Sequence, residues 1–206
     1  NTVFSQVFGV AVTTKLATEM IAAGNYVLAA DGVTKVANLS SSQIAMLLSQ
    51  SIKSQGWKGI VSAANAAATG VNVCTRDIGS GTRAAANTVF LQNGAAGLLP
   101  FTAKPSQANV TSPTDTAAKF YINEAGSGGG VVTCLGNVNA LTKGFGIGLL
   151  TLGQGTNANY SFAAVDGVIP SRDNAKIGKY NFWVESFIQT NAASTMSAGA
   201  VPGAGG

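Results

Sequence analysis

The chain has 206 residues and a formal net charge of +4, and only 10% of its residues are charged. It contains no histidine, which excludes histidine-based triads and histidine metal sites, and its twelve Lys and Arg residues form no run, which argues against a nucleic-acid-binding surface. The low charge and the 26 glycines suit a secreted or assembled protein better than a highly charged cytosolic one.

The first part of the chain predicts alternating strands and helices. Residues 3–12 form a strand whose second half is apolar at nearly every position, a pattern that indicates burial on both faces. Thr13 or Thr14 then caps a helix. Short strands are expected at 26–30 and 34–37, around an Asp-Gly turn.

A capping box marks the start of the next helix, because Ser40 is followed three residues later by Gln43. This helix has an apolar stripe formed by Ile44, Leu47, Leu48 and Ile52. Trp57 is expected to pack against the stripe, and contact with a ligand is the alternative.

The central feature of the chain is a turn between a strand and a helix. Residues 71–74 predict a buried strand, and residues 82–93 predict a helix. The start of a helix leaves backbone N–H groups unpaired and carries partial positive charge, so it attracts anions. The sequence therefore predicts an anion site at this turn.

The side chains of the turn suit a small oxyanion. Ser80 and Thr82 add hydroxyl donors, Gly79 and Gly81 allow a ligand to approach the backbone, and Arg76 offers a planar fork of donors. The alternative is a turn followed by a Ser or Thr N-cap, without a ligand. The stretch lacks the Gly-Lys-Ser/Thr of a P-loop and the later acidic residue of a Rossmann fingerprint.

The second half of the chain continues the alternation. It predicts a long loop at 94–113, strands at 120–122 and 158–168, a helix at 131–138, a strand or helix at 180–190 and a small-residue tail at 194–206. Strands that alternate with helices along the whole chain predict an α/β fold.

A second Gly-rich stretch, residues 123–130, precedes the helix expected at 131–138. We interpret it as a flexible connection, because no cationic residue lies beside it in the sequence. A second anion contact is the alternative.

Cys74 and Cys134 are the two cysteines of the chain. In a secreted protein they are expected to form a disulfide, which the loop-entropy model rates at roughly 4 kcal/mol. Two buried free thiols are the alternative. Two cysteines without histidine do not complete a four-ligand zinc site, so no metal is expected.

The eight carboxylates show no close pair at a catalytic spacing. We therefore expect a protein that is not an enzyme, with no catalytic residues and no cofactor.

Several stretches together resemble one family. Residues 76–82 read Arg-x-x-Gly-Ser-Gly-Thr, which is similar to the phosphate-binding motif of the periplasmic phosphate-binding proteins of ABC transporters, in the type II periplasmic binding protein superfamily. Further stretches resemble this family in the same order, at 7–12, 39–49 with Trp57, 144–148 and 165–171. The resemblance covers about residues 3 to 188.

The resemblance implies the second lobe of a type II periplasmic-binding-protein-like fold with a C-terminal return segment. Residues 1–165 correspond to the ligand-binding lobe, 166–190 to the return segment toward the other lobe, and 191–206 to a small-residue tail. The implied protein is periplasmic or extracellular and binds phosphate or a related oxyanion. The implied partner is an ABC transporter permease or a missing N-terminal lobe. A homo-oligomer is a further expectation, which does not come from the resemblance.

The chain departs from the family pattern beside the arginine. The family has an aspartate two residues after it, whereas this chain has Ile78 there and Asp77 one place earlier. Neighbours on a strand point to opposite faces, so Asp77 is not expected to orient Arg76. Asp77 is nevertheless the local candidate ligand for the proton that hydrogen phosphate carries.

The resemblance also begins partway through the family's chain, so the N-terminal part of the first lobe has no counterpart. Either the sequence is a fragment or half of the binding cleft has been lost. The competing hypothesis is structural: an assembly subunit of an extracellular or surface complex, built on the same fold with no or residual anion binding. Low charge and the small-residue tail favour it.

Overall fold

The computed structural model describes residues 2–49, 57–67, 70–91 and 120–187. Its strands are β1 (Thr2–Thr13), β2 (Tyr26–Leu28), β3 (Lys35–Leu39), β4 (Val71–Arg76), β5 (Phe120–Ala125), β6 (Gly146–Thr151), β7 (Tyr160–Val165) and β8 (Trp183–Phe187). Its helices are α1 (Thr14–Ala22), α2 (Ser41–Leu48), α3 (Ala63–Ala67), α4 (Gly81–Leu91), α5 (Gly128–Ala140) and α6 (Arg172–Lys176), with a 3-10 turn at Leu152–Gln154.

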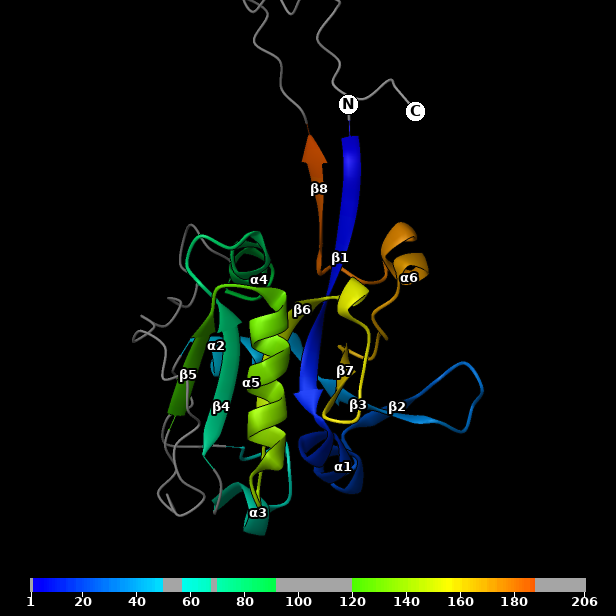
Figure 1. Ribbon diagram of the computed structural model, residues 1–206. Coiled ribbons are helices and arrows are strands. Elements are labelled where there is room, and N and C mark those ends of the chain that lie inside the picture. Colours follow the sequence, from blue (N-terminus) through cyan, green and yellow to red (C-terminus); the bar gives the residue numbers. More distant parts are fainter. Residues whose placement is uncertain (1, 50–56, 68–69, 92–119, 188–206) are drawn as a thin grey trace, which may run out of the picture.

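These strands form one mixed sheet in the order β2-β3-β7-β1-β6-β4-β5, with β8 paired to β1 (Figure 1). β1 runs antiparallel to β6 and β7, with Val10 opposite both Leu149 and Ala163. β4 runs parallel to both β5 and β6. Strands and helices alternate along most of the chain, which confirms the α/β prediction.

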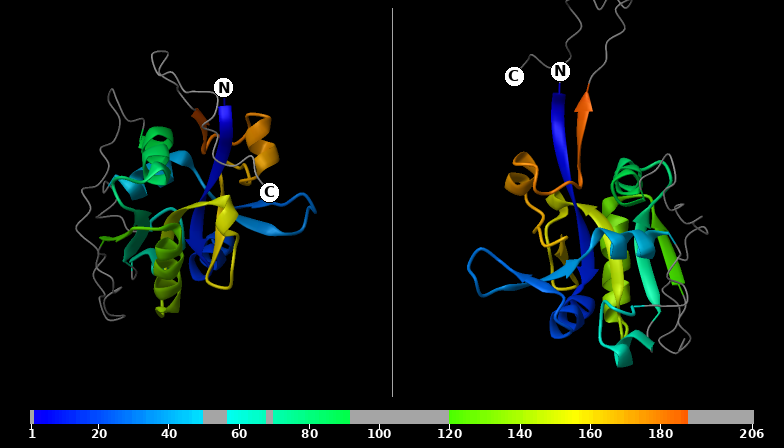
Figure 2. Two further views of the ribbon diagram at one scale, coloured as in Figure 1. Left: turned by 45° about the horizontal axis from the view of Figure 1, so that its top comes forward. Right: turned by 180° about the vertical axis from the view of Figure 1, so that it is seen from behind.

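Strand β1 extends beyond the neighbouring strands β6 and β7. Its second half is buried between β6 and β7, and Val10, Ala11 and Val12 are fully buried, as their apolar run predicts. Its first half pairs with β8, and the two strands project together beyond the sheet (Figures 1 and 2). The β2–β3 hairpin projects to the side in both views of Figure 2.

The sheet is covered on both faces. Val10 and Val12 pack in one hydrophobic cluster with residues of α1, α2 and α4, whereas Ala11 packs in a second cluster with Val131 and Leu135 of α5. Adjacent residues of a strand point to opposite faces, so α5 lies on the face opposite α2 and α4. Figure 1 shows α5 in front of the sheet.

The predicted helix starts are confirmed. Thr13 caps α1 by accepting a hydrogen bond from the Leu16 N–H, and Ser40 and Gln43 form a capping box at the start of α2. Trp57 is fully buried in the same cluster as the α2 stripe, and its indole N–H donates to the Gly70 carbonyl at 3.0 Å. It is therefore a core residue.

Some boundaries differ from those expected. The helix expected at 131–138 starts earlier, at Gly128, and within 180–190 the structure has a strand at Trp183–Phe187, with no helix among the described residues of that stretch. Helices α3 and α6 were not expected, since each is only five residues long. Ile52, the loop at 94–113 and the tail at 191–206 lie outside the described residues. Within the described ranges, no helix has the length and apolar character needed to cross a bilayer.

Candidate functional site

The turn singled out in the sequence joins β4 to α4, as predicted. β4 ends at Arg76 and α4 begins at Gly81. The Ser80 N–H donates to the Asp77 carbonyl at 3.1 Å, and the Ala84 N–H donates to the Ser80 carbonyl at 2.9 Å, which opens the helical ladder. The three intervening N–H groups, at residues 81–83, belong to the helix start that has no intrahelical acceptors.

Several donors at this helix start make no hydrogen bond within the described part of the chain. The N–H groups of Gly81 and Thr82 make no hydrogen bond with any other described residue, and neither do the hydroxyls of Ser80 and Thr82. Both side chains are buried, with Ser80 6% exposed and Thr82 8% exposed. The Ser127 hydroxyl, by contrast, accepts from the Gly130 N–H at 3.0 Å as an ordinary cap.

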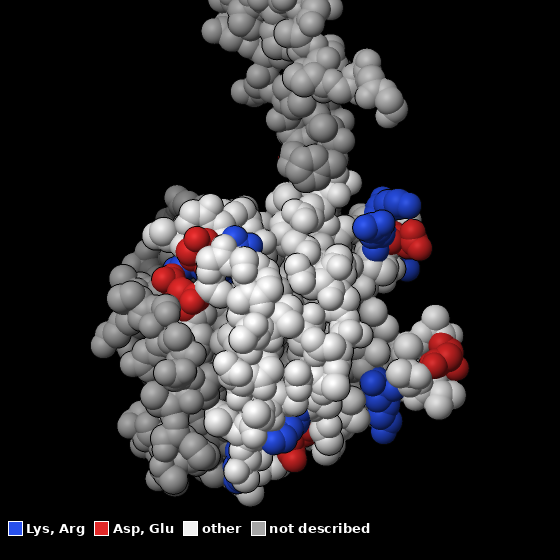
Figure 3. All heavy atoms as spheres, in the orientation of Figure 1, with Lys and Arg blue, Asp and Glu red and all other residues white. Residues whose placement is uncertain are grey.

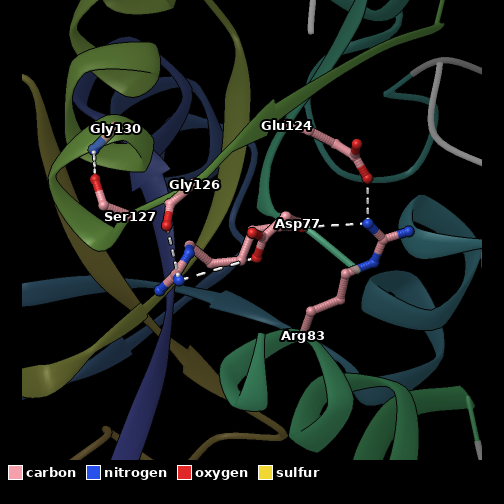
Figure 4. Close-up of polar contacts among 7 residues, drawn as sticks. Asp77, Arg83, Glu124, Gly126, Ser127 and Gly130 are labelled. Carbon is pink, nitrogen blue, oxygen red and sulfur yellow. Dashed lines mark hydrogen bonds and ion pairs between the residues drawn. The ribbon is translucent and has the colours of Figure 1, made fainter. Parts of the chain in front are cut away.

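The Arg76 side chain lies at the end of β4 and is partly buried. Its Nη2 donates to the Gly126 carbonyl at 3.1 Å and lies 3.9 Å from the Asp77 carboxylate (Figure 4). Its Nε is buried and makes no hydrogen bond with any residue that the structure describes. The guanidinium is thus held toward the Gly-rich turn before α5, and part of its donor set is unused.

The structure corrects the interpretation of the Gly-rich stretch at 123–130. The sequence predicts a flexible connection without a neighbouring cation, but in the structure Arg76 contacts this stretch at Gly126. Ser127 caps α5, and Gly128 to Gly130 form the first turn of that helix. The sequence could not show this, because Arg76 and Gly126 are brought together by the parallel pairing of β4 with β5, in which Arg76 lies opposite Ala125.

Asp77 also lies differently from the sequence expectation. β4 ends at Arg76, so the alternation rule for strands does not extend to Asp77, and its carboxylate turns toward the guanidinium. This carboxylate is 53% exposed, and the neighbouring Ile78 is 87% exposed. The ion pair with Arg76 is long and open to solvent.

Arg83 is a part of the site that the sequence reasoning missed. Its side chain is 7% exposed, donates to the Arg76 carbonyl at 3.2 Å and forms an ion pair with Glu124 of β5 (Figure 4). It therefore connects the ends of β4 and β5 beneath the turn. The available signal was that Arg83 is the single charged residue in the helix expected at 82–93.

The glycines of the turn are not required by the backbone. A Cβ atom built on Gly79 or Gly81 would meet no atom within 4 Å, and neither residue has a positive φ. A Cβ on Gly144 would instead lie 2.1 Å from the Val138 carbonyl oxygen, so packing demands a glycine there. The space above the turn at Gly79 and Gly81 is open.

The predicted disulfide is present. Cys74 of β4 is bonded to Cys134 of α5, with 5.9 Å between the Cα atoms. It ties the strand that leads into the turn to the helix that begins beside Arg76. In the described residues, no group of three or more His, Cys, Asp or Glu side chains could hold a metal ion.

Charged groups are sparse on the face drawn in Figure 3 and gather in a few places. One group, with both signs, lies at the upper ends of β4 and β5, where Arg76, Asp77, Arg83 and Glu124 are found. The helix starts of α4 and α5 lie at this same edge of the sheet (Figure 1). The edge therefore combines a guanidinium with two helix N-termini.

Comparisons with known proteins find similar solved structures but no matching family. No family model matches it, and no curated protein matches it. Similar structures include a putative phosphate ABC transporter substrate-binding protein with bound phosphate from Clostridium perfringens, with 19% identity over 87% of this chain and 54% of that one and a TM-score of 0.46. PstS from Borrelia burgdorferi has 16% identity over 88% of this chain and 58% of that one, with a TM-score of 0.46.

An ABC-type phosphate transport receptor from Vibrio cholerae has 19% identity over 88% of this chain and 56% of its own, with a TM-score of 0.48. This chain spans a little over half the length of each of the three structures. It is thus similar to structures whose names describe phosphate transport, over part of their length.

Proposed function

We propose that the chain is a solute-binding protein that holds phosphate or a similar tetrahedral oxyanion at the N-terminus of α4. The observation that carries the proposal is the set of donors without partners: the N–H groups of Gly81 and Thr82 and the hydroxyls of Ser80 and Thr82. Although Ser80 and Thr82 are buried residues, their hydroxyl oxygens are not among the buried atoms without a partner, so they keep accessible surface and an acceptor supplied from outside the chain can reach them.

The chemistry of these donors suits an anion. The helix start contributes partial positive charge, and each hydrogen bond to a charged group contributes about 1.5–3 kcal/mol net. Arg76 would supply full positive charge from the end of β4, and Asp77 would accept the proton of hydrogen phosphate. Gly79 and Gly81 leave room for the ligand without strain in the fold.

The affinity depends on whether solvent is excluded from the turn. The turn is open where Asp77 and Ile78 are exposed, so we expect millimolar binding, about 4 kcal/mol, by the chain alone. Closure by a second lobe would strengthen every hydrogen bond by removing water, and micromolar binding would follow.

The remaining parts of the proposal concern organisation and location. Residues 1–165 would form the binding lobe, and 166–190 would return along β1 toward a second lobe, which the pairing of β8 with β1 supports. The disulfide supports a periplasmic or extracellular protein, because such bonds persist in oxidising compartments. An ABC transporter permease would then be the partner that receives the ligand.

Calorimetric titration with phosphate, sulfate and arsenate tests the proposal. Arg76→Ala and Thr82→Val should each weaken binding of the preferred anion by about tenfold or more, because each removes a donor to a charged group. Arg172→Ala is the matched control: Arg172 lies on α6, away from the turn, and its loss should leave the affinity unchanged.

Gly81→Val provides a second test of the same site. Its Cβ has open space, so the variant should fold normally while its side chain obstructs the anion. Circular dichroism checks the fold, and the same titration checks binding. The proposal fails if neither Arg76→Ala nor Gly81→Val changes the affinity for any of the three anions.

A further inference from the structure

Arg83 and Glu124 form an ion pair that none of the proposed ligand contacts uses. Arg83 lies in the first turn of α4, and Glu124 is the last residue but one of β5. Their side chains are 7% and 21% exposed, so the pair is largely shielded from solvent. Replacing both members of such a pair by uncharged residues is often neutral for stability, so stability alone does not account for the pair.

The pair is one link in a closed ring of contacts around the end of β4. The Nη1 atom of Arg83 donates both to Glu124 and to the Arg76 carbonyl, the latter at 3.2 Å. The Nη2 atom of Arg76 donates in turn to the carbonyl of Gly126, which lies two residues after Glu124. Figure 4 shows the Arg83–Glu124 pair on one side of the ring and Gly126 on the other.

The ring contains both kinds of donor that we propose for the oxyanion. Arg83 is the third residue of α4, so it is part of the same helical turn as the N–H groups of Gly81 and Thr82. Because α4 and α5 cover opposite faces of the sheet, Arg76 is held at its carbonyl from the α4 side and at its guanidinium from the α5 side. The ring therefore fixes the guanidinium relative to the helix start.

Holding the donors in place before the ligand arrives favours binding. A flexible side chain that becomes immobilised on binding lowers the affinity, and a side chain already held avoids that loss. Arg83 itself is turned toward the Arg76 carbonyl and Glu124 and exposes little surface to a ligand. Its charge is also offset by that of Glu124, so the pair adds little net attraction for an anion.

We propose that Arg83 and Glu124 are positioning residues of the oxyanion site, which hold Arg76 and the start of α4 in the arrangement that the anion needs. This inference rests on the proposed function of the turn. Its effect is opposite in sign to that of simple electrostatics. If charge alone mattered, removing the Glu124 carboxylate would strengthen anion binding, whereas loss of the ring weakens it.

The test is a titration of ¹⁵N-labelled protein with inorganic phosphate, followed by NMR at the amides of Gly81 and Thr82. Glu124→Ala should weaken phosphate binding by about threefold or more, because Arg83 loses its partner and Arg76 is held less firmly. Glu124→Gln keeps an acceptor oxygen for Arg83, so it should recover most of the affinity that Glu124→Ala loses.

Asp173→Ala is the matched control for loss of a carboxylate. Asp173 lies on α6, and its side chain is 92% exposed and pairs with Lys176. Its removal should leave phosphate binding unchanged.

A double replacement removes the ring without changing the net charge. Arg83→Met combined with Glu124→Gln leaves no charged group unpaired, so it should fold even if Glu124→Ala does not. Electrostatics predicts the affinity of the original chain for this variant, whereas loss of the ring predicts binding weaker by about threefold or more.

A second readout does not depend on binding. The Nε–H group of Arg76 is buried and makes no hydrogen bond with a described residue, so its NMR signal reports how firmly the guanidinium is held. The signal should be sharp in the original chain, and broader and faster to exchange with water in Glu124→Ala and in the double variant. If the original chain binds no phosphate, sulfate or arsenate, the proposed function fails, and this signal still decides whether the ring holds Arg76.

Two results would overturn the positioning role. One is phosphate binding by the double variant that is as tight as, or tighter than, that of the original chain. The other is an Arg76 Nε–H signal that is the same in the original chain and in both variants. A role in stability alone would give these results, because it lowers the fraction of folded protein and leaves the folded site unchanged.

Discussion

Two arginines seven positions apart differ completely in what surrounds them. Arg83 is buried, and it is bonded to the Arg76 carbonyl and to Glu124. Arg76 is partly exposed, contacts one carbonyl and one distant carboxylate, and has a buried Nε without a partner. The bonds of Arg83 indicate a role in the fold, whereas Arg76, which is less fully bonded, is the arginine that we propose for the oxyanion site.

Arg83→Met should lower the free energy of unfolding by about 2 kcal/mol, less than for a fully buried pair because Glu124 is 21% exposed. The loss arises because Glu124 and the Arg76 carbonyl each lose a donor. Urea denaturation monitored by circular dichroism measures it. Lys176→Met removes the solvent-exposed pair with Asp173 and should change stability by under about 0.5 kcal/mol. Equal effects of the two variants would contradict the structural role given to Arg83.

The elements around the site are joined covalently as well as by hydrogen bonds. β4 leads into α4, β5 leads into α5, and the two parallel strands end at the same edge of the sheet. The Cys74–Cys134 bond connects β4 directly to α5. The two helix starts are therefore fixed relative to one another by a strand pairing and by a cross-link.

Replacing Cys74 and Cys134 together by alanine should lower the free energy of unfolding by about 4 kcal/mol, because the unfolded chain regains the entropy of a 60-residue loop. Urea denaturation of the double variant measures this change. The original chain under reducing conditions is the control and should lose a similar amount. A loss below about 1 kcal/mol in both would show that the cross-link contributes little constraint.

At the scale of the whole molecule, β1 holds the sheet together. It pairs with β6, β7 and β8, which come from the last third of the chain. Its second half is hydrogen-bonded on both sides, whereas β2 lies at one end of the strand order and pairs with β3. Stability should therefore be distributed unevenly across the sheet.

We expect the amides of Val10 to Val12 to exchange with solvent at least about 100-fold more slowly than those of the β2–β3 hairpin, because β1 opens only when the sheet does. Hydrogen exchange followed by NMR measures both sets in one sample. Similar protection of Tyr26 to Leu28 and of β1 would contradict this distribution.

The sequence by itself determined the local structure and much of its chemistry. The apolar run of β1, the cap at Thr13, the capping box at Ser40 and the strand–turn–helix around residues 76–82 depend on neighbouring residues, so they could be predicted. The cysteine pairing was also predicted, because the chain offers a single pair.

The tertiary structure alone decided which distant groups meet. Arg76 contacts Gly126 and Arg83 contacts Glu124, and neither contact follows from local pattern. The physical reason is that strand order and register bring together residues many positions apart, while propensity and capping act over only a few. The sequence thus predicted the turn between β4 and α4. The pairing of β4 with β5 determined that the Gly-rich stretch before α5 lies next to it.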